Sequence, residues 1–299
     1  MTDQEMHSRM KSAKGFIAAL DQSGGSTPGA LRQYGIGESA YSGEAEMFRL
    51  VHEMRVRIIT APAFNGDKVL AAILFERTMD GEAGGKPVPK FLWGERRIVP
   101  ILKVDQGLQP EQNGVSMMKP MPALDGLLAR AVKAGIFGTK MRSVINLPSA
   151  DGIAEIVGQQ FEFAAQIAAH GLIPIIEPEV SIKSPDKGGA ERILRSNILA
   201  KLDALPDGRQ VMLKLTIPSE PDFYTDLIRH DRVLRVVALS GGYSRAEACD
   251  KLAENHGMIA SFSRALVEDL KQSMSDAEFD AALAASIDQI YRASTEKVG

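Results

Sequence analysis

The chain has 299 residues, of which 44% are hydrophobic, so it can bury a large core as one α/β domain or two smaller ones. A net charge of −3 gives no general attraction to nucleic acid or to anionic membranes. The single cysteine, Cys249, excludes disulfides within the chain and argues against a thiolate metal site. No long apolar run and no signal segment are visible, which predicts a soluble cytoplasmic protein with no membrane contact.

Eight apolar segments of strand length follow a polar helical arm at about 1–14. These segments lie at 15–21, 69–76, 97–105, 135–142, 171–179, 211–216, 232–240 and 257–264. Helical patterns fill most of the intervals, at 123–134, 158–170, 191–205 and 244–255. The last of these helices opens with the capping-box pattern of Ser244 and Glu247. The segment 81–89 predicts a surface loop.

Strands that alternate with helices predict right-handed crossovers and a parallel sheet. Eight such units in a chain of this length favour a closed (β/α)₈ TIM barrel formed by a single domain, residues 1–299. An open doubly wound sheet is the alternative. The G-x-G-x-x-G turn with which such a sheet would bind a dinucleotide is absent from the sequence.

The strand at 211–216 carries a lysine, Lys214, in the middle of an apolar run. A run this apolar is typical of a strand that is buried on both faces. A lysine in such a place needs compensation, because transfer of an unpaired ammonium into the protein interior is costly. Lys214 is therefore either half of a buried ion pair or a neutral, nucleophilic amine of the kind that forms a Schiff base.

Most of the eight segments carry charged or polar residues in their second half. These residues are Asp21, Glu76, Lys103, Asp105, Lys140, Arg142, Glu177, Glu179, Lys214, Ser240 and Arg264. Pairs such as Glu177 and Glu179 are two residues apart and share one face of a strand. In a barrel these faces converge at the C-terminal ends of the strands, where the active sites of such enzymes lie.

The five histidines do not form a metal-binding pattern. His170, His230 and His256 each precede a strand, at the opposite end of such a barrel, and no H-x-x-H or H-E-x-x-H spacing occurs. We therefore expect no metal site, and we expect the chemistry to depend on lysines and carboxylates.

Two segments are candidate anion sites. Ser240, Gly241 and Gly242 form a glycine turn before the capped helix, and Arg264 follows the last strand. Barrel enzymes often bind a phosphate at this place, although glycine at such a junction also serves geometry alone. The second candidate is the polar segment 23–27 with Lys103 near it, which is alternatively a plain polar loop. Two facing anion sites suit a substrate with a phosphate at each end.

The strand ends also resemble a known family. The segments concerned are ALDQS at 19–23, LFERT at 74–78, LKVDQG at 102–107, TKMR at 139–142, IEPE at 176–179, LK at 213–214, LSGG at 239–242 and SFSRAL at 261–266. In this order they resemble the motifs of the class I, Schiff-base fructose-bisphosphate aldolases, in the short form of the bacterial branch. The resemblance implies reversible cleavage of fructose 1,6-bisphosphate, a step of glycolysis and gluconeogenesis, without a cofactor.

The resemblance also implies a role for each site residue. Lys214 would form the Schiff base, Glu177 would act as its general acid and base, and Lys140 would lie beside Lys214. Asp21 would orient or accept the proton of the hydroxyl group released on carbon–carbon cleavage. Ser240, Gly241, Gly242 and Arg264 would bind one phosphate. Ser23, Ser26 and Lys103 would bind the other, supported by the charge of Arg142.

Several features depart from the family pattern. Gln22 replaces an acid, Met141 stands where tryptophan is usual, and the tyrosine-ended tail of animal members is not expected here. A related ketose phosphate, such as tagatose 1,6-bisphosphate or a ketose 1-phosphate, is an alternative substrate. A non-catalytic phosphosugar-binding barrel is the alternative to an enzyme. A homo-oligomer is compatible with the sequence.

Overall fold

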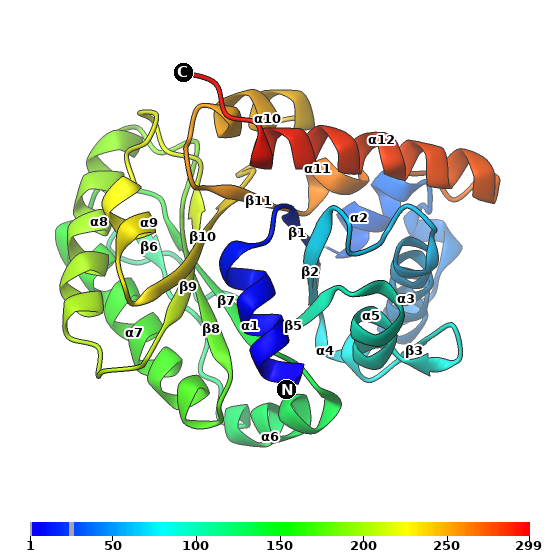
Figure 1. Cartoon of the computed structure of the whole chain (residues 1–299), viewed down its shortest axis with the longest axis horizontal. Helices are drawn as coiled ribbons and strands as arrows, with labels where there is room; N and C mark the ends of the chain where they lie inside the picture. Colours follow the sequence, from blue (N-terminus) through cyan, green and yellow to red (C-terminus); the bar gives the residue numbers. More distant parts are fainter. Residues whose placement is uncertain (1, 24–26) are drawn as a thin grey trace.

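The computed structural model describes residues 2–23 and 27–299. In this part of the chain, eight parallel strands close into a barrel with helices around it (Figure 1). The barrel strands are β1 (Phe16–Leu20), β2 (Val69–Leu74), β5 (Val99–Lys103), β7 (Gly138–Ile145), β8 (Ile173–Val180), β9 (Val211–Thr216), β10 (Val233–Leu239) and β11 (Ile259–Phe262). Pairing of β5 with β7, and of β1 with β11, closes the ring. The predicted (β/α)₈ barrel is confirmed.

Helices and short strands occupy the connections. The helices are α1 (Thr2–Ser12), α2 (Thr27–Tyr34), α3 (Gly43–Thr60), α4 (Glu76–Met79), α5 (Val88–Arg96), α6 (Leu124–Ala134), α7 (Ala150–Ala169), α8 (Lys187–Asp203), α9 (Thr225–Arg229), α10 (Arg245–Ala253), α11 (Arg264–Val267) and α12 (Asp276–Thr295). The short strands are β3 (Glu82–Ala83), β4 (Lys86–Pro87) and β6 (Val115–Ser116). None of the described helices is long and apolar enough to cross a membrane.

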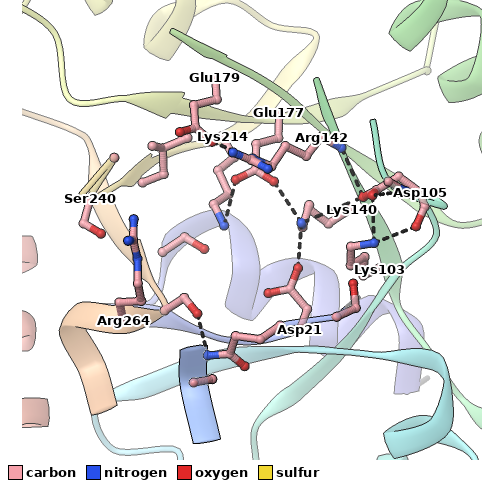
Figure 2. Close-up of a pocket in the computed structure, with 18 of the residues that line it drawn as sticks. Asp21, Lys103, Asp105, Lys140, Arg142, Glu177, Glu179, Lys214, Ser240 and Arg264 are labelled. Atoms are coloured by element: carbon pink, nitrogen blue, oxygen red, sulfur yellow. Dashed lines mark hydrogen bonds and ion pairs between the residues drawn. The ribbon is translucent and has the colours of Figure 1, made fainter. Parts of the chain in front are cut away.

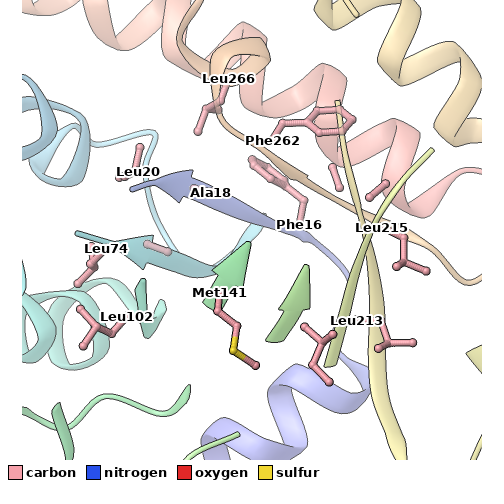
Figure 3. Packing of buried hydrophobic residues seen from close by; sticks show 14 of the residues in the cluster. Phe16, Ala18, Leu20, Leu74, Leu102, Met141, Leu213, Leu215, Phe262 and Leu266 are labelled. Carbon is pink, nitrogen blue, oxygen red and sulfur yellow. The ribbon is translucent and has the colours of Figure 1, made fainter. Parts of the chain in front are cut away.

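Side chains of each barrel strand alternate between two hydrophobic clusters. Phe16, Ala18 and Leu20 of β1 point outward and pack beneath the helices, as Figure 3 shows. Ile17 and Ala19 point inward and belong to the smaller cluster that fills the barrel. This two-residue period follows from the geometry of a strand. It also separates the two faces of each strand: one face packs beneath the helices, and the other lines the interior.

Helix α1 closes the N-terminal end of the barrel. Met6 and Met10 are buried against the inward side chains of the strands, including Ile17 and Leu70. Arg235 of β10 donates through Nε to the carbonyl of Met10 at 2.8 Å, which satisfies a carbonyl in the last turn of the helix. The polar arm expected at the N-terminus is therefore a helix with one buried face.

Two local expectations were wrong. The segment 81–89 is not a plain loop, because β3 and β4 pair there as an antiparallel hairpin and Val88 is buried. Helix α7 begins at Ala150, eight residues before its expected start, because the Ser149 hydroxyl accepts a hydrogen bond from the Gly152 amide and caps the helix.

Candidate active site

A pocket of about 690 Å³ lies at the C-terminal ends of the barrel strands. Among the residues that line it are Asp21, Ser23, Lys103, Asp105, Lys140, Arg142, Glu177, Glu179, Lys214, Ser240, Gly241 and Arg264. Figure 2 shows ten of its charged and polar side chains converging on one space from different strands. Most of the candidate residues that the sequence singled out are thus brought together.

The alternation of each strand explains this convergence. In β9, Leu213 and Leu215 point outward, so Lys214 shares the inward face with Met212. In β8, Ile176 points outward and Glu177 lies on the inward face. The inward rows are therefore apolar deep in the barrel and become charged in their last layer, at the mouth.

Lys214 and Glu177 are in direct contact in this last layer. Lys214 Nζ lies 3.0 Å from Glu177 Oε1, and the two residues are 4% and 3% exposed. The buried ion pair that the sequence left open is therefore present. Its acidic partner is itself a proton acceptor on the same wall of the pocket, so the pair also places a base within reach of the amine. The backbone amide of Glu177 donates to Gln160 Oε1 at 2.8 Å, which holds this segment of β8 in place.

Lys140 lies at the centre of the acidic groups. Its Nζ is 2.6 Å from Asp21 Oδ2, 3.0 Å from Glu177 Oε2 and 4.0 Å from Asp105 Oδ2. Burial lowers the pKa of Lys140, but the charges of these three acids outweigh burial and raise the pKa above its usual value. Lys140 therefore remains an ammonium group, and it connects to Lys214 through the carboxylate of Glu177.

Asp21 follows strand β1 and faces Lys140 across the pocket. Burial raises the pKa of Asp21, but Lys140 and Lys214 act in the opposite direction and bring it well below its usual range. The Asp21 carboxylate is consequently ionised and able to accept a hydrogen bond or a proton from a bound molecule.

A second set of ion pairs lines the side of the pocket formed by β5, β7 and β8. Lys103 Nζ lies 2.7 Å from Asp105 Oδ1, and Arg142 Nε lies 2.5 Å from Glu179 Oε2. Burial lowers the pKa of Arg142, but the charge of Glu179 and the hydrogen bond to it outweigh burial and raise the pKa above its usual value. The guanidinium therefore stays charged. Both cations are already paired, so an anion that enters must share them with these carboxylates.

The turn after β10, predicted as an anion site, has a geometry that requires glycine. Gly241 and Gly242 have φ angles of +61° and +115°, which favour glycine. A Cβ atom on Gly241 would also lie only 2.7 Å from Ile182 Cγ2, so a side chain has no room there. A Cβ atom on Gly242 would lie 3.6 Å from Arg264 Nη2, which places the guanidinium beside the turn. No carboxylate of the described residues lies within ion-pair distance of Arg264.

The other expected anion site is described only in part. Ser23 lines the pocket together with Lys103. Ser26 lies outside the described residues.

Comparison with known proteins adds to this geometry. The family model for class-I fructose-bisphosphate aldolase matches residues 6–213. The chain is 58% identical over 292 residues to a class 1 fructose-bisphosphate aldolase of a Synechocystis species, covering 98% of this chain and 97% of the relative. It is 55% identical to the enzyme of the same description from Porphyromonas gingivalis, covering 98% of this chain and 99% of that protein. The chain belongs to the class I fructose-bisphosphate aldolase family.

A solved structure of fructose-bisphosphate aldolase from Plasmodium falciparum has the same fold, with a TM-score of 0.71 over 100% of this chain and 96% of that one. Its sequence identity is only 22%. In this member of the aldolase family, the departure at Met141 lies on the outward face of β7, away from the pocket. The departure at Gln22 lies at the pocket itself, where Gln22 Nε2 donates to Ser263 Oγ at 2.7 Å.

Glu76 is the one charged strand end that does not reach the pocket. It begins helix α4 and forms an ion pair with Arg130 on the outside of the barrel. The expectation that its side chain would join the others at the mouth was wrong, because Glu76 lies two residues after the outward-pointing Leu74 and begins α4 on the outer side of the barrel.

The three histidines that precede strands lie outside the pocket lining. Each is next to an aspartate: His170 beside Asp125, His230 beside Asp203 and His256 beside Asp222. Within residues 2–23 and 27–299, no group of three or more histidine, cysteine or acidic side chains is arranged to hold a metal ion.

Sequence reasoning missed two buried polar residues behind the pocket. Gln160 of α7 accepts from the Glu177 amide, and Arg55 of α3 is 1% exposed. A signal was available for Arg55, because it lies three residues before Ile58 and four after Val51, on the apolar stripe of its helix. An arginine on such a stripe indicates a buried polar partner.

Proposed function

We propose that the protein is a lyase that reversibly cleaves fructose 1,6-bisphosphate to dihydroxyacetone phosphate and glyceraldehyde 3-phosphate through a Schiff base on Lys214. The observation that carries this proposal is the contact of a buried amine, Lys214, with a buried base, Glu177, beside a permanent cation, Lys140. The two relatives at more than half identity support the choice of substrate. We expect this reaction of soluble sugar phosphates to take place in the cytoplasm.

Formation of the Schiff base begins with proton transfer from the Lys214 ammonium to Glu177, 3.0 Å away. The free amine then adds to the ketone carbon of the sugar and forms a carbinolamine. Protonated Glu177 returns its proton to the hydroxyl group, which leaves as water, and an iminium remains. One carboxylate thus serves as base and then as acid, and Lys140 at 3.0 Å stabilises its ionised form.

Cleavage follows from the iminium. The hydroxyl group at carbon four gives its proton to Asp21, the bond between carbons three and four breaks, and its electron pair moves toward the iminium nitrogen to form an enamine. The aldehyde leaves, and protonation and hydrolysis of the remaining three-carbon imine free Lys214. Asp21 suits this role because Lys140 and Lys214 keep it ionised in a buried place.

We assign one phosphate of the substrate to each end of the pocket. Ser240, Gly241, Gly242 and Arg264 would bind one phosphate, since a glycine turn and the guanidinium beside it together supply several donors. Ser23, Ser26 and Lys103 would bind the other, with Arg142 as a supporting charge.

Borohydride reduction in the presence of dihydroxyacetone phosphate tests the covalent step. We expect a three-carbon adduct on the peptide that contains Lys214, and cleavage activity that persists in excess chelator. Lys214→Met should abolish both the adduct and turnover, whereas replacement of the exposed Lys201 by Met should change neither. An unmodified Lys214 in a protein that retains chelator-resistant turnover would overturn the proposal, and unchanged turnover of Lys214→Met would point to a mere binding role for the barrel's lysine.

A related ketose phosphate is the second candidate, such as a ketose 1-phosphate or tagatose 1,6-bisphosphate. The observation that favours it is the pairing of Lys103 with both the carboxylate and the carbonyl of Asp105, which competes with a second phosphate. If the pocket binds no phosphate at that end, fructose 1-phosphate and fructose 1,6-bisphosphate should be cleaved with equal kcat/KM. A large preference for the bisphosphate would favour the first candidate.

A further inference from the structure

Arg55 is a buried cation that the catalytic scheme does not use. It lies in the middle of α3, is 1% exposed, and belongs to a helix face that also buries Met47, Val51 and Ile58. No carboxylate within the described part of the chain approaches it to ion-pair distance. A buried charge without an acidic partner costs stability, and apolar replacements of buried charged groups are often neutral or stabilising. Packing of the helix alone therefore gives no reason for an arginine at this position.

The hydrogen bonds of Arg55 point toward the rear of the pocket. Its Nη2 donates to the backbone carbonyl of Gln22, and its Nη1 donates to the Thr78 hydroxyl at 3.0 Å. The aromatic ring of Phe75 lies 5.8 Å from the guanidinium carbon. The two nitrogens at the tip of the guanidinium thus connect α3 to the turn after β1 and to α4.

Gln22 is the residue between two pocket-lining residues, Asp21 and Ser23. Its carbonyl belongs to the peptide group that joins it to Ser23, so the bond from Arg55 fixes the orientation of this peptide plane. Its side chain donates to Ser263 across the seam of the barrel. Backbone pairing between β1 and β11 stops before this point, at Ala18 and Phe262. Pairing with β2 on the other side continues to Leu20, so the turn that carries Asp21 depends on side chains for its position relative to β11.

The charge of Arg55, like its hydrogen bonds, acts on the segment that carries Asp21. Burial lowers the pKa of Arg55 to about 10, and the negative charge of Asp21 opposes this shift. The guanidinium therefore stays charged at neutral pH, behind a carboxylate that has to remain ionised.

We propose that Arg55 is a positioning residue for Asp21, which holds the turn after β1 through the Gln22 carbonyl so that the Asp21 carboxylate meets the reacting hydroxyl. This inference rests on the proposed function, in which Asp21 acts only in carbon–carbon cleavage. Loss of Arg55 should therefore slow cleavage and leave formation of the Schiff base from dihydroxyacetone phosphate intact. A misplacement of about 1 Å at a reacting group is enough to cost about a hundredfold in rate.

The test compares kcat for fructose 1,6-bisphosphate cleavage with the yield of the borohydride-reduced dihydroxyacetone phosphate adduct. For Arg55→Met we expect kcat to fall between about tenfold and a hundredfold, a smaller change in KM, and an adduct yield like that of the unmodified protein. Arg55→Lys should give an intermediate kcat, because an ammonium can reach the Gln22 carbonyl but lacks the planar fork that holds both acceptors.

Arg57 supplies a matched control on the same helix. Its guanidinium also donates to backbone carbonyls, those of Gln272 and Met274, but these lie on the side of α12 and away from the pocket. Arg57→Met should lower the melting temperature and leave kcat per folded molecule unchanged.

Three results would overturn the inference: an Arg55→Met protein with the kcat of Arg57→Met, an adduct yield that falls in parallel with kcat, or a wild-type kcat for Arg55→Lys. If Arg55→Met does not fold, the comparison of Arg55→Lys with the unmodified protein decides by the same two measurements. Failure of the proposed function looks different, because the unmodified protein would then give no adduct at Lys214.

Discussion

Lys140 is the residue on which the charge balance of the pocket depends. It contacts the carboxylates of Asp21 and Glu177 at the same time, so it offsets repulsion between two acids that would otherwise face each other in a buried space. Two buried carboxylates that approach each other without a cation cannot both stay ionised, and one of them then takes up a proton. The two proton-transfer roles that we assign to Asp21 and Glu177 therefore both depend on this one ammonium group.

Replacement of Lys140 by Met should consequently disable the acid–base chemistry and spare the fold. We expect kcat to fall by roughly 10²- to 10⁴-fold, the range that a positioned proton-transfer group contributes. Steady-state kinetics on protein with a normal circular dichroism spectrum checks this, with the exposed Lys201→Met as control. A kcat within a few-fold of the unmodified protein would show that the proton transfers do not depend on Lys140.

The lowered pKa of Asp21 also predicts a pH dependence of stability. Because Asp21 binds its proton more weakly in the folded protein than in the unfolded chain, its contribution is fully present above the unfolded value of about 3.9. That contribution is lost as the pH falls further, toward the lower folded value. Melting temperatures measured between pH 7 and pH 3 should therefore fall less steeply for Asp21→Asn than for the unmodified protein. The exposed Asp231→Asn should follow the unmodified curve, and identical slopes for all three would contradict the assignment.

At the scale of the elements, the helix starts differ in how completely they are capped. Ser275 at the start of α12 forms a full capping box, in which its hydroxyl accepts from the Glu278 amide and the Glu278 carboxylate accepts from the Ser275 amide. Ser244 at the start of α10 accepts from the Glu247 amide. The reciprocal bond to Glu247 is not formed there, although the sequence shows the same pattern at both helices.

This difference predicts unequal costs for the same substitution. Ser275→Ala should destabilise the protein by about 1 kcal/mol or more, and Ser244→Ala by less, because only the first also removes a hydrogen bond that the hydroxyl donates to the carboxylate, from Ser275 Oγ to Glu278 Oε2 at 2.8 Å. Urea unfolding of both variants measures the two free energies. Equal losses would mean that the bond from the Ser275 hydroxyl to the Glu278 carboxylate contributes nothing at α12.

The barrel strands could be located from the sequence because each is an apolar run that is buried on both faces. The inward direction of Lys214 and Glu177 also follows from the sequence, since a period of two residues relates them to the apolar residues before them. Glu76 differs from Lys214 and Glu177 because the same period relates it to Leu74, which points outward. The apolar stripe of α3 indicates that Arg55 is buried, but no local pattern identifies its partner, a backbone carbonyl more than thirty residues away.

The early start of α7 and the hairpin at 82–87 were missed for a related reason. A cap of one hydroxyl on one amide, as at Ser149, decides a helix start without any change in hydrophobic period. The two-residue strands β3 and β4 are too short to show a period at all. Elements without a repeating pattern are fixed by single contacts, and those contacts are known only from the structure.

At the scale of the whole molecule, the two ends of the barrel have different functions. The C-terminal end holds the charged pocket, and the N-terminal end is closed by Met6 and Met10 of α1. Substitutions at the two ends should therefore change stability and catalytic activity independently of one another.

Met10→Ala tests this separation. The side chain is completely buried, so its loss should lower the free energy of unfolding by about 2–5 kcal/mol and leave kcat per folded molecule unchanged. The exposed Lys11→Ala on the same helix should change neither quantity appreciably. Denaturant titration together with kinetics below the unfolding transition measures both, and a loss of kcat in Met10→Ala would show that the two ends are coupled.

The pairing of β1 with β11 determines when the barrel can close during synthesis of the chain. Arg235, which caps α1, and Ser261, the register partner of Ile17, are synthesised more than two hundred residues after the elements that they complete. Until then the first strand of the ring has an unpaired edge and the first helix has no complete surface on which to dock. The ring can therefore close, and α1 can be capped, only after β10 and β11 have been synthesised.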